Sequence, residues 1–257
     1  MFTDTFPNFE KGRILKKQML ENLRDYPRNF LDIYFKNYSN GIISGADMCI
    51  GDNITIKKGI VKHNNRIYML EDEFELPYYP TNREVLIKIK FLGESHEGDF
   101  IQHPSKILID DNTEIGKDEL ELGRFKLREG AVLRSDYKDF YDFSTEFNTV
   151  NIINVEYAGF ETSTISPVIL SYFSNIILKS NSDNIYDISF AMQCTGEKSV
   201  DRKLIIHYIS KRLGIEHKDY SNVLIYKHLT TIVRELENGI KRNMDIRPNR
   251  PSRIIVD

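Results

Sequence analysis

The sequence predicts an α+β protein, because its apolar side chains follow two different periods in different parts of the chain. Residues 41–92 alternate apolar with polar side chains, as half-buried strands do, and Gly and Asn turns separate the runs. Residues 166–240 repeat apolar side chains every three to four positions, as amphipathic helices do. We therefore expect an N-terminal helical segment (1–40), a central antiparallel β-domain of sandwich or barrel type (41–160), a C-terminal helical domain (161–240) and an extended basic arm (241–257).

The N-terminal segment is expected to be helical over residues 9–38. Met19 and Leu23 belong to an apolar stripe with four-residue spacing, and charged side chains fill the positions between them. Pro27 predicts a break or kink near Tyr26, because proline removes a helical hydrogen bond.

The β-domain is expected to consist of short strands joined by tight turns. Asn64-Asn65 predicts such a turn, because asparagine tolerates a positive φ. The Gly93–Asp99 stretch is expected to be a loop. Further strands are expected near 85–90, 106–109 and 121–127.

Capping residues divide the helical domain into separate helices. Ser166, followed by proline, predicts a helix start, and Gly214 predicts a helix end. Ser199 is expected to cap the helix that Gly214 ends, and Ser221 or Asp219 to begin the last one. The apolar stripes of these helices are either core or surfaces that face a neighbouring subunit.

Composition and charge are those of an ordinary globular protein. The 257 residues are 40% hydrophobic and 28% charged, with 15 Phe and 14 Tyr to build a core. The net charge of −3 is too small to favour nucleic acid or a membrane surface as the main partner. The apolar runs are far shorter than the roughly 20 residues of a membrane span, and the N-terminus does not read as a signal peptide. We expect a protein made in the cytoplasm, with Cys49 and Cys194 as free thiols.

Sequence motifs for catalysis or cofactor binding are missing, so we expect no catalytic, cofactor or metal site. The chain has no phosphate-binding glycine loop, no dinucleotide fingerprint and no nucleophile elbow. His96, Glu97, Asp99 and His103 are metal-ligand types, but they are expected to form a solvated loop, since their spacing fixes no coordination geometry.

Three aspartates, Asp136, Asp139 and Asp142, could converge if their segment were helical. Converging carboxylates can carry out acid–base chemistry or bind a cation, which leaves an enzyme as one alternative. A solvated face beside an aromatic groove is the simpler interpretation, because aromatic residues and Lys138 lie between the three.

The C-terminal arm is the candidate partner-binding segment. Two prolines disfavour helix, and a β-branched apolar triplet near the end could add a strand to the sheet edge of a neighbour while arginines pair with acidic residues. A disordered tail is the alternative interpretation. The candidate partner-binding residues are Arg247, Arg250, Arg253, Ile254, Ile255 and Val256.

Three segments carry a resemblance to a known class of protein. Residues 41–45 (Gly-Ile-Ile-Ser-Gly), followed by 54–61 and 66–70, resemble the strand–glycine–strand opening of bacteriophage and contractile-tail baseplate proteins. Residues 122–127 (Leu-Gly-Arg-Phe-Lys-Leu) resemble the strand that follows in such proteins, and 136–170 the joint into their helical half. The abundance of Ile, Lys, Asn and Tyr is similar to that of clostridial prophage or bacteriocin proteins.

This resemblance implies a structural component of a phage or phage-tail-like particle, in its baseplate or fibre-attaching region. Its partners would be other tail or baseplate proteins, in an oligomer without catalytic residues or cofactors, resident in the particle. A receptor- or glycan-binding tail protein is the first alternative, and an enzyme that uses 136–142 is the second. The first alternative needs an exposed aromatic cluster, for which the candidates are Tyr78, Tyr79, Tyr137 and Tyr141.

Overall fold

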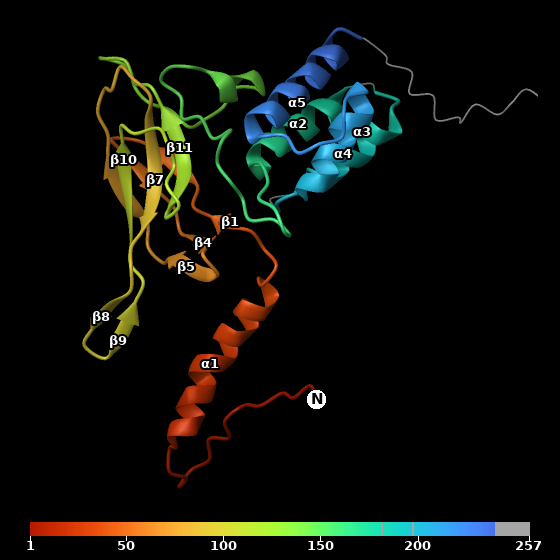
Figure 1. The fold of residues 1–257 in the computed structure, drawn as a ribbon. Coiled ribbons are helices and arrows are strands. Elements are labelled where there is room, and N and C mark those ends of the chain that lie inside the picture. Colours follow the sequence, from red (N-terminus) through yellow and green to blue (C-terminus); the bar gives the residue numbers. More distant parts are fainter. Residues whose placement is uncertain (181, 197, 240–257) are drawn as a thin grey trace, which may run out of the picture.

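A computed structural model describes residues 1–180, 182–196 and 198–239 of this protein. A projecting helix, a group of small antiparallel sheets and a helical bundle follow one another along the chain (Figure 1). The predicted α+β class is thereby confirmed, while the domain boundaries drawn from the sequence stay predictions. None of the helices in the described ranges is both long and apolar enough to cross a bilayer.

The eleven strands of the described chain pair with one another antiparallel and form three three-stranded sheets and one hairpin. The first sheet has the order β1 (Gly41–Gly45), β4 (Gly59–His63), β5 (Arg66–Leu70). The second has the order β2 (Met48–Ile50), β3 (Asn53–Ile56), β6 (Phe74–Pro77), and the third β10 (Ser105–Asp110), β7 (Val85–Phe91), β11 (Glu119–Phe125). The hairpin of β8 (Ser95–Glu97) and β9 (Phe100–Gln102) corrects the expected loop at 93–99.

One hydrophobic core unites the three sheets. It contains Ile42 of the first sheet, Ile54 of the second and Ile87 of the third, each at most 2% exposed. Apolar and polar side chains alternate along the strands because only one face of each sheet can reach this core. β7 lies in the middle of its sheet and is buried on both faces, so the Lys88 ammonium is buried as well. It is neutralised by Asp110 at 2.8 Å and Glu119 at 2.9 Å.

A second hydrophobic core, rich in aromatic rings, holds the helical bundle together. The Phe173 ring packs against Phe140, Phe190 and Tyr208 at centroid distances of 5.9–6.0 Å. Phe140 precedes the short 3₁₀ helix η1 (Tyr141–Ser144), so residues from before the first bundle helix also fill this core. The bundle helices are α2 (Pro167–Lys179), α3 (Ile185–Gln193), α4 (Arg202–Leu213) and α5 (Asn222–Glu237).

Close backbone contacts join the strand region to the segment that leads into the bundle. The Ile42 amide donates to the Glu156 carbonyl at 3.0 Å, and the Ala158 amide donates to the Ile42 carbonyl at 2.8 Å. Gly41 makes this approach possible, because a Cβ at its φ of +138° would meet Glu156 O at 2.7 Å. The Tyr226 hydroxyl of α5 donates to the Phe140 carbonyl at 2.8 Å, which ties η1 to the bundle.

Local signals predicted several helix ends and one turn correctly. The Ser166 hydroxyl accepts from the Val168 amide at the start of α2, and Gly214 ends α4 with a φ of +68°. Ser221 is the N-cap of α5. Asn64 and Asn65 take positive φ values of 46° and 60° between β4 and β5.

The break that was one of the two outcomes predicted at Pro27 is absent, and the cap predicted at Ser199 is wrong. Helix α1 (Lys17–Tyr34) continues through Pro27, because the helix is exposed there and water can serve the carbonyl that loses its helical donor. The N-cap of α4 is Asp201, whose carboxylate accepts from the Lys203 amide. Ser199 instead donates to the Ala158 carbonyl at 3.2 Å and so helps to join the two halves.

Candidate functional site

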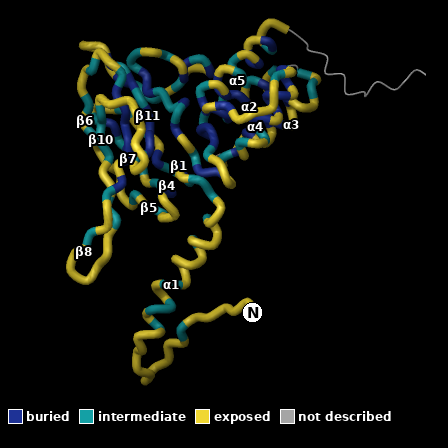
Figure 2. Tube along the Cα trace, in the orientation of Figure 1, coloured by how far each residue is buried: buried dark blue, intermediate teal, exposed yellow. Residues whose placement is uncertain are grey.

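Helix α1 carries an apolar face, although none of its residues is buried. Tyr26 is 50% exposed, Phe30 61% and Ile33 75%. In Figures 1 and 2, α1 projects away from the sheets and the bundle and is exposed along most of its length. Isolated helices of this length are marginal in water, so a helix with an exposed apolar face is typical of a protein-binding element.

Only the C-terminal half of α1 comes close to the sheets, on the side opposite the apolar face. Arg28, Leu31 and Asp32 line a recess of about 730 Å³ between the helix and the 64–69 hairpin. At the end of the helix, the buried Lys62 ammonium donates to the Tyr38 carbonyl at 2.7 Å and also to the Phe35 carbonyl. Burial lowers the pKa of Lys62. The helix is therefore anchored at its C-terminal end.

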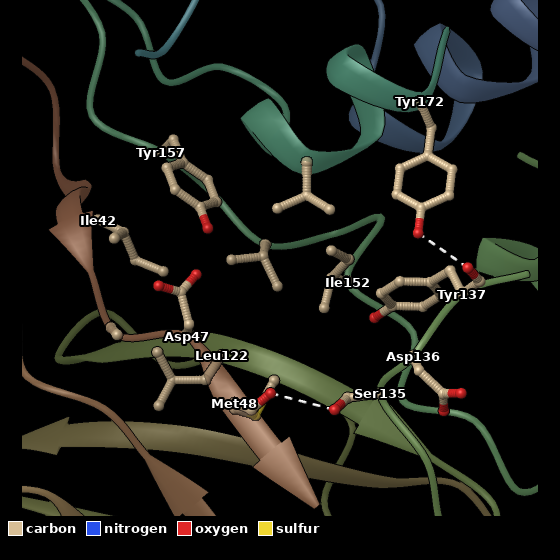
Figure 3. Close-up of a pocket in the computed structure, with 13 residues that line it drawn as sticks. Ile42, Asp47, Met48, Leu122, Ser135, Asp136, Tyr137, Ile152, Tyr157 and Tyr172 are labelled. Atoms are coloured by element: carbon tan, nitrogen blue, oxygen red, sulfur yellow. Dashed lines mark hydrogen bonds between the residues drawn. The ribbon is translucent and has the colours of Figure 1, made fainter. Parts of the chain in front are cut away.

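A cavity of about 300 Å³ lies between the sheets and the bundle. Figure 3 shows Asp47 and Tyr157 at one end of this cavity and Asp136, Tyr137 and Tyr172 at the other. Asp47 belongs to the turn between β1 and β2, and Tyr172 to α2, so the cavity exists only because the two halves meet. The apolar part of its wall is formed by Ile42, Ala46, Met48, Leu122, Ile152, Val155 and Val168.

Hydrogen bonds hold two of the three tyrosines in place. The Tyr137 hydroxyl donates to the Val150 carbonyl at 2.8 Å, and the Tyr172 hydroxyl donates to the Tyr137 carbonyl at 2.8 Å. Burial raises the pKa of Tyr137 and of Tyr157, so these two phenols stay neutral at physiological pH. The carboxylates of Asp47 and Asp136, in contrast, are exposed and form no hydrogen bond or ion pair with the described residues.

The three aspartates of the predicted acid–base cluster take separate structural roles. The buried Asp142 carboxylate accepts two hydrogen bonds from Arg134, both at 2.6 Å, one from the Lys138 amide and one from Thr145. Asp139 accepts from the backbone amides that begin η1. Only Asp136 borders the cavity. Two of the three carboxylates on which the enzyme alternative depends thus stabilise this loop by accepting hydrogen bonds.

The four tyrosines of the receptor-binding alternative do not form one exposed cluster. Tyr78 is half-buried against the core of the sheets, whereas Tyr137 and Tyr141 pack against the core of the bundle. The Tyr141 hydroxyl donates to Glu237 at 2.6 Å. Burial, and after it this hydrogen bond, raises the pKa of Tyr141 to about 12. Tyr79 is exposed by 58%.

The remaining candidates are the histidines of the expected loop and the residues of the C-terminal arm. His96 and His103 lie 3.3 and 3.6 Å from Glu94 at the β8–β9 hairpin. Within the described ranges, no group of three or more His, Cys, Asp or Glu side chains could hold a metal ion. The predicted partner-binding residues Arg247, Arg250, Arg253, Ile254, Ile255 and Val256 lie outside the described residues.

Two features of the site were not predicted from the sequence. Asp47 gave no signal, because its role depends on residues more than a hundred positions away in α2. The apolar stripe of α1 was visible, but the pattern is the same for a helix in a core and for a helix that faces a partner.

Comparisons with known proteins yield distant structural likeness only. No family model matches the chain, and no curated protein matches it. The crystal structure of TssK aligns with 90% of this chain and 68% of its own, at 7% identity and a TM-score of 0.44. In the cryo-electron microscopy structure of the type VI secretion system TssK–TssF–TssG baseplate subcomplex, a chain aligns with 91% of this chain and 99% of its own, at 8% identity and a TM-score of 0.40. Likeness at this level does not establish a shared family, and neither structure supports a phage origin.

Proposed function

We propose that this chain is a structural subunit that acts by assembling with other protein chains, in the baseplate or fibre-attaching region of a phage or phage-tail-like contractile particle. The observation that carries the proposal is the apolar face of α1, none of whose residues is buried; the Tyr26 hydroxyl on this face donates to Asp4 at 3.3 Å, but the ring is still 50% exposed. The resemblance of residues 41–45, 54–61 and 122–127 to baseplate proteins supports the kind of particle. Such a subunit would be made in the cytoplasm and reside in the particle.

The partner that best fits α1 is the same helix of a second copy. Met19, Leu23, Tyr26, Phe30 and Ile33 follow one another at spacings of four, three, four and three residues. This is the heptad spacing with which helices pack side by side, with these residues at the a and d positions. The stripe therefore fits a partner helix of similar shape.

Charge and area are both consistent with self-association. Asn22 and Asn29 occupy the g positions of this heptad, and Leu20, Pro27 and Tyr34 the e positions, so the seam carries no charge that would repel an identical helix. The three basic and three acidic residues of α1 balance one another. The exposed apolar side chains of α1 are Leu20, Leu23, Tyr26, Phe30, Ile33 and Tyr34. If each of these six contributes roughly 100 Å², two copies bury on the order of 1,200 Å², the lower end of stable interfaces.

The proposal predicts that the full chain is an oligomer and that charges on the seam dissociate it. Replacing both Leu23 and Phe30 with Asp should yield monomers of 30.1 kDa in light scattering coupled to size-exclusion chromatography. Arg28→Asp, which changes the charge equally on the opposite side of the helix, is the matched control and should stay oligomeric. A wild-type chain that is monomeric at about 100 µM, or a double variant as oligomeric as the wild type, would refute self-association through α1.

The assignment to a particle has a separate test. A tagged full-length chain should co-purify with tail-like particles from its source, and negative-stain electron microscopy should locate the tag at one end of them. A chain that oligomerises but is absent from such particles would contradict the baseplate assignment and leave the assembly role intact.

A further inference from the structure

We propose that the cavity between the sheets and the bundle binds an arginine guanidinium of the C-terminal arm (241–257), from the same or a neighbouring copy. The cavity of about 300 Å³ is at the small end of ligand sites, and is of a size for one long side chain rather than a larger ligand. The inference concerns the cavity and is independent of the role proposed for α1.

The walls of the cavity suit a planar cation. Asp47 and Asp136 contribute two carboxylates, and Tyr137, Tyr157 and Tyr172 contribute aromatic rings. Guanidinium groups pair with carboxylates and stack on aromatic faces, and the combination favours arginine over lysine. The two carboxylates would repel an anionic ligand. A neutral ligand would find the Tyr137 and Tyr172 hydroxyls already donating to backbone carbonyls.

The described chain supplies no cation to this cavity. Its lining contains no lysine, arginine or histidine. Arg134 is close in sequence to Asp136, but its guanidinium is held by both oxygens of Asp142 at 2.6 Å. Neither Asp47 nor Asp136 therefore forms an ion pair with a described residue, and Arg134 acts on the Asp136 carboxylate only through a weaker electrostatic attraction.

The arm is the segment of this chain whose charge complements the cavity. Residues 241–257 contain five basic residues and two acidic ones, whereas the chain as a whole has a net charge of −3. Arg247, Arg250 and Arg253 each offer a guanidinium, and two prolines between them limit the conformational entropy lost on binding.

The end of the described chain contacts the segment that leads into the cavity wall. Glu237, close to the end of the described chain, accepts a hydrogen bond from Tyr141 of η1 at 2.6 Å. The segment that leads into η1 carries Asp136 and Tyr137 of the cavity wall. Arg247 lies eight positions after residue 239, and this length of chain can extend by up to about 26 Å.

The test uses the full-length chain with its own arm inactivated. Arg247, Arg250 and Arg253 are all replaced by Gln, and a synthetic peptide of residues 241–257 is titrated into this chain by isothermal calorimetry. We expect saturable binding that weakens at least ten-fold when Asp47→Asn is added, and that weakens in high salt, because the carboxylate attraction is lost or screened.

Matched controls separate this result from general charge attraction. Asp99→Asn, at the exposed β8–β9 hairpin, removes the same charge elsewhere and should leave the affinity unchanged. A peptide with the three arginines replaced by Gln should not bind. The proposal is overturned if the wild-type peptide does not bind at about millimolar concentration, if Asp47→Asn has no effect, or if the Gln peptide binds equally well.

Discussion

Replacing Arg212 with Met should lower the free energy of unfolding by about 3–5 kcal/mol, because two buried carboxylates would lose the cation between them. The Arg212 guanidinium donates to Asp187 at 3.0 Å and to Glu235 at 2.9 Å, and all three side chains are buried inside the bundle. The Tyr208 hydroxyl also donates to Asp187, at 2.8 Å. Urea denaturation followed by far-ultraviolet circular dichroism measures the loss.

The neighbouring Lys211 offers the matched control for this variant. It lies in the same turn of α4 but is exposed, so Lys211→Met should change stability by less than about 0.5 kcal/mol. An Arg212→Met chain within about 1 kcal/mol of the wild type would show that the network contributes little to folding. Asp187, Arg212 and Glu235 connect α3, α4 and α5, so we expect the variant to loosen the whole bundle.

Replacing Asp142 with Asn should cost about 2–4 kcal/mol at neutral pH, and the cost should shrink in acid. The hydrogen bonds from Arg134 hold the pKa of Asp142 well below its ordinary value of 3.8. A carboxyl whose pKa is lowered by folding stabilises the protein above its ordinary pKa, and this contribution is lost as the pH falls through and below that value. Wild type and variant should therefore approach one another between about pH 5 and pH 2, as measured by urea denaturation at each pH.

Asp136 provides the control for the pH dependence. It lies in the same loop, but its exposed carboxylate has no hydrogen-bond partner among the described residues. Asp136→Asn should therefore change stability by less than about 0.5 kcal/mol over the same pH range. A constant difference between wild type and Asp142→Asn at all pH values would contradict the assigned role of the ion pair with Arg134.

Secondary structure was predictable from the sequence wherever the signal was local. The switch from period two to period three-to-four separates strands from helices, because it reflects how each backbone directs its side chains. Ser166, Gly214 and the Asn64-Asn65 turn act on backbone groups within a few residues of themselves. Such signals need no knowledge of the tertiary contacts.

Predictions failed where a distant contact or solvent decided the outcome. Ser199 was predicted as a cap, but its hydroxyl donates to the Ala158 carbonyl, 41 positions away. Asp201 caps α4 instead. Asp142 was a candidate for acid–base chemistry until the fold brought Arg134 and Thr145 to its two oxygens. Sequence spacing does not reveal which of several possible partners a carboxylate acquires.

The sequence by itself determined the α+β class, the succession of an N-terminal helix, strands and a helical bundle, and the apolar stripe of α1, because periodicity and capping depend on neighbouring residues. Only the tertiary structure decided that this stripe stays exposed, and that Asp47 and Asp136 border one cavity with three tyrosines. The physical reason is that burial and charge pairing depend on which surfaces meet in space. For α1 and for the cavity these surfaces come from segments far apart in the chain.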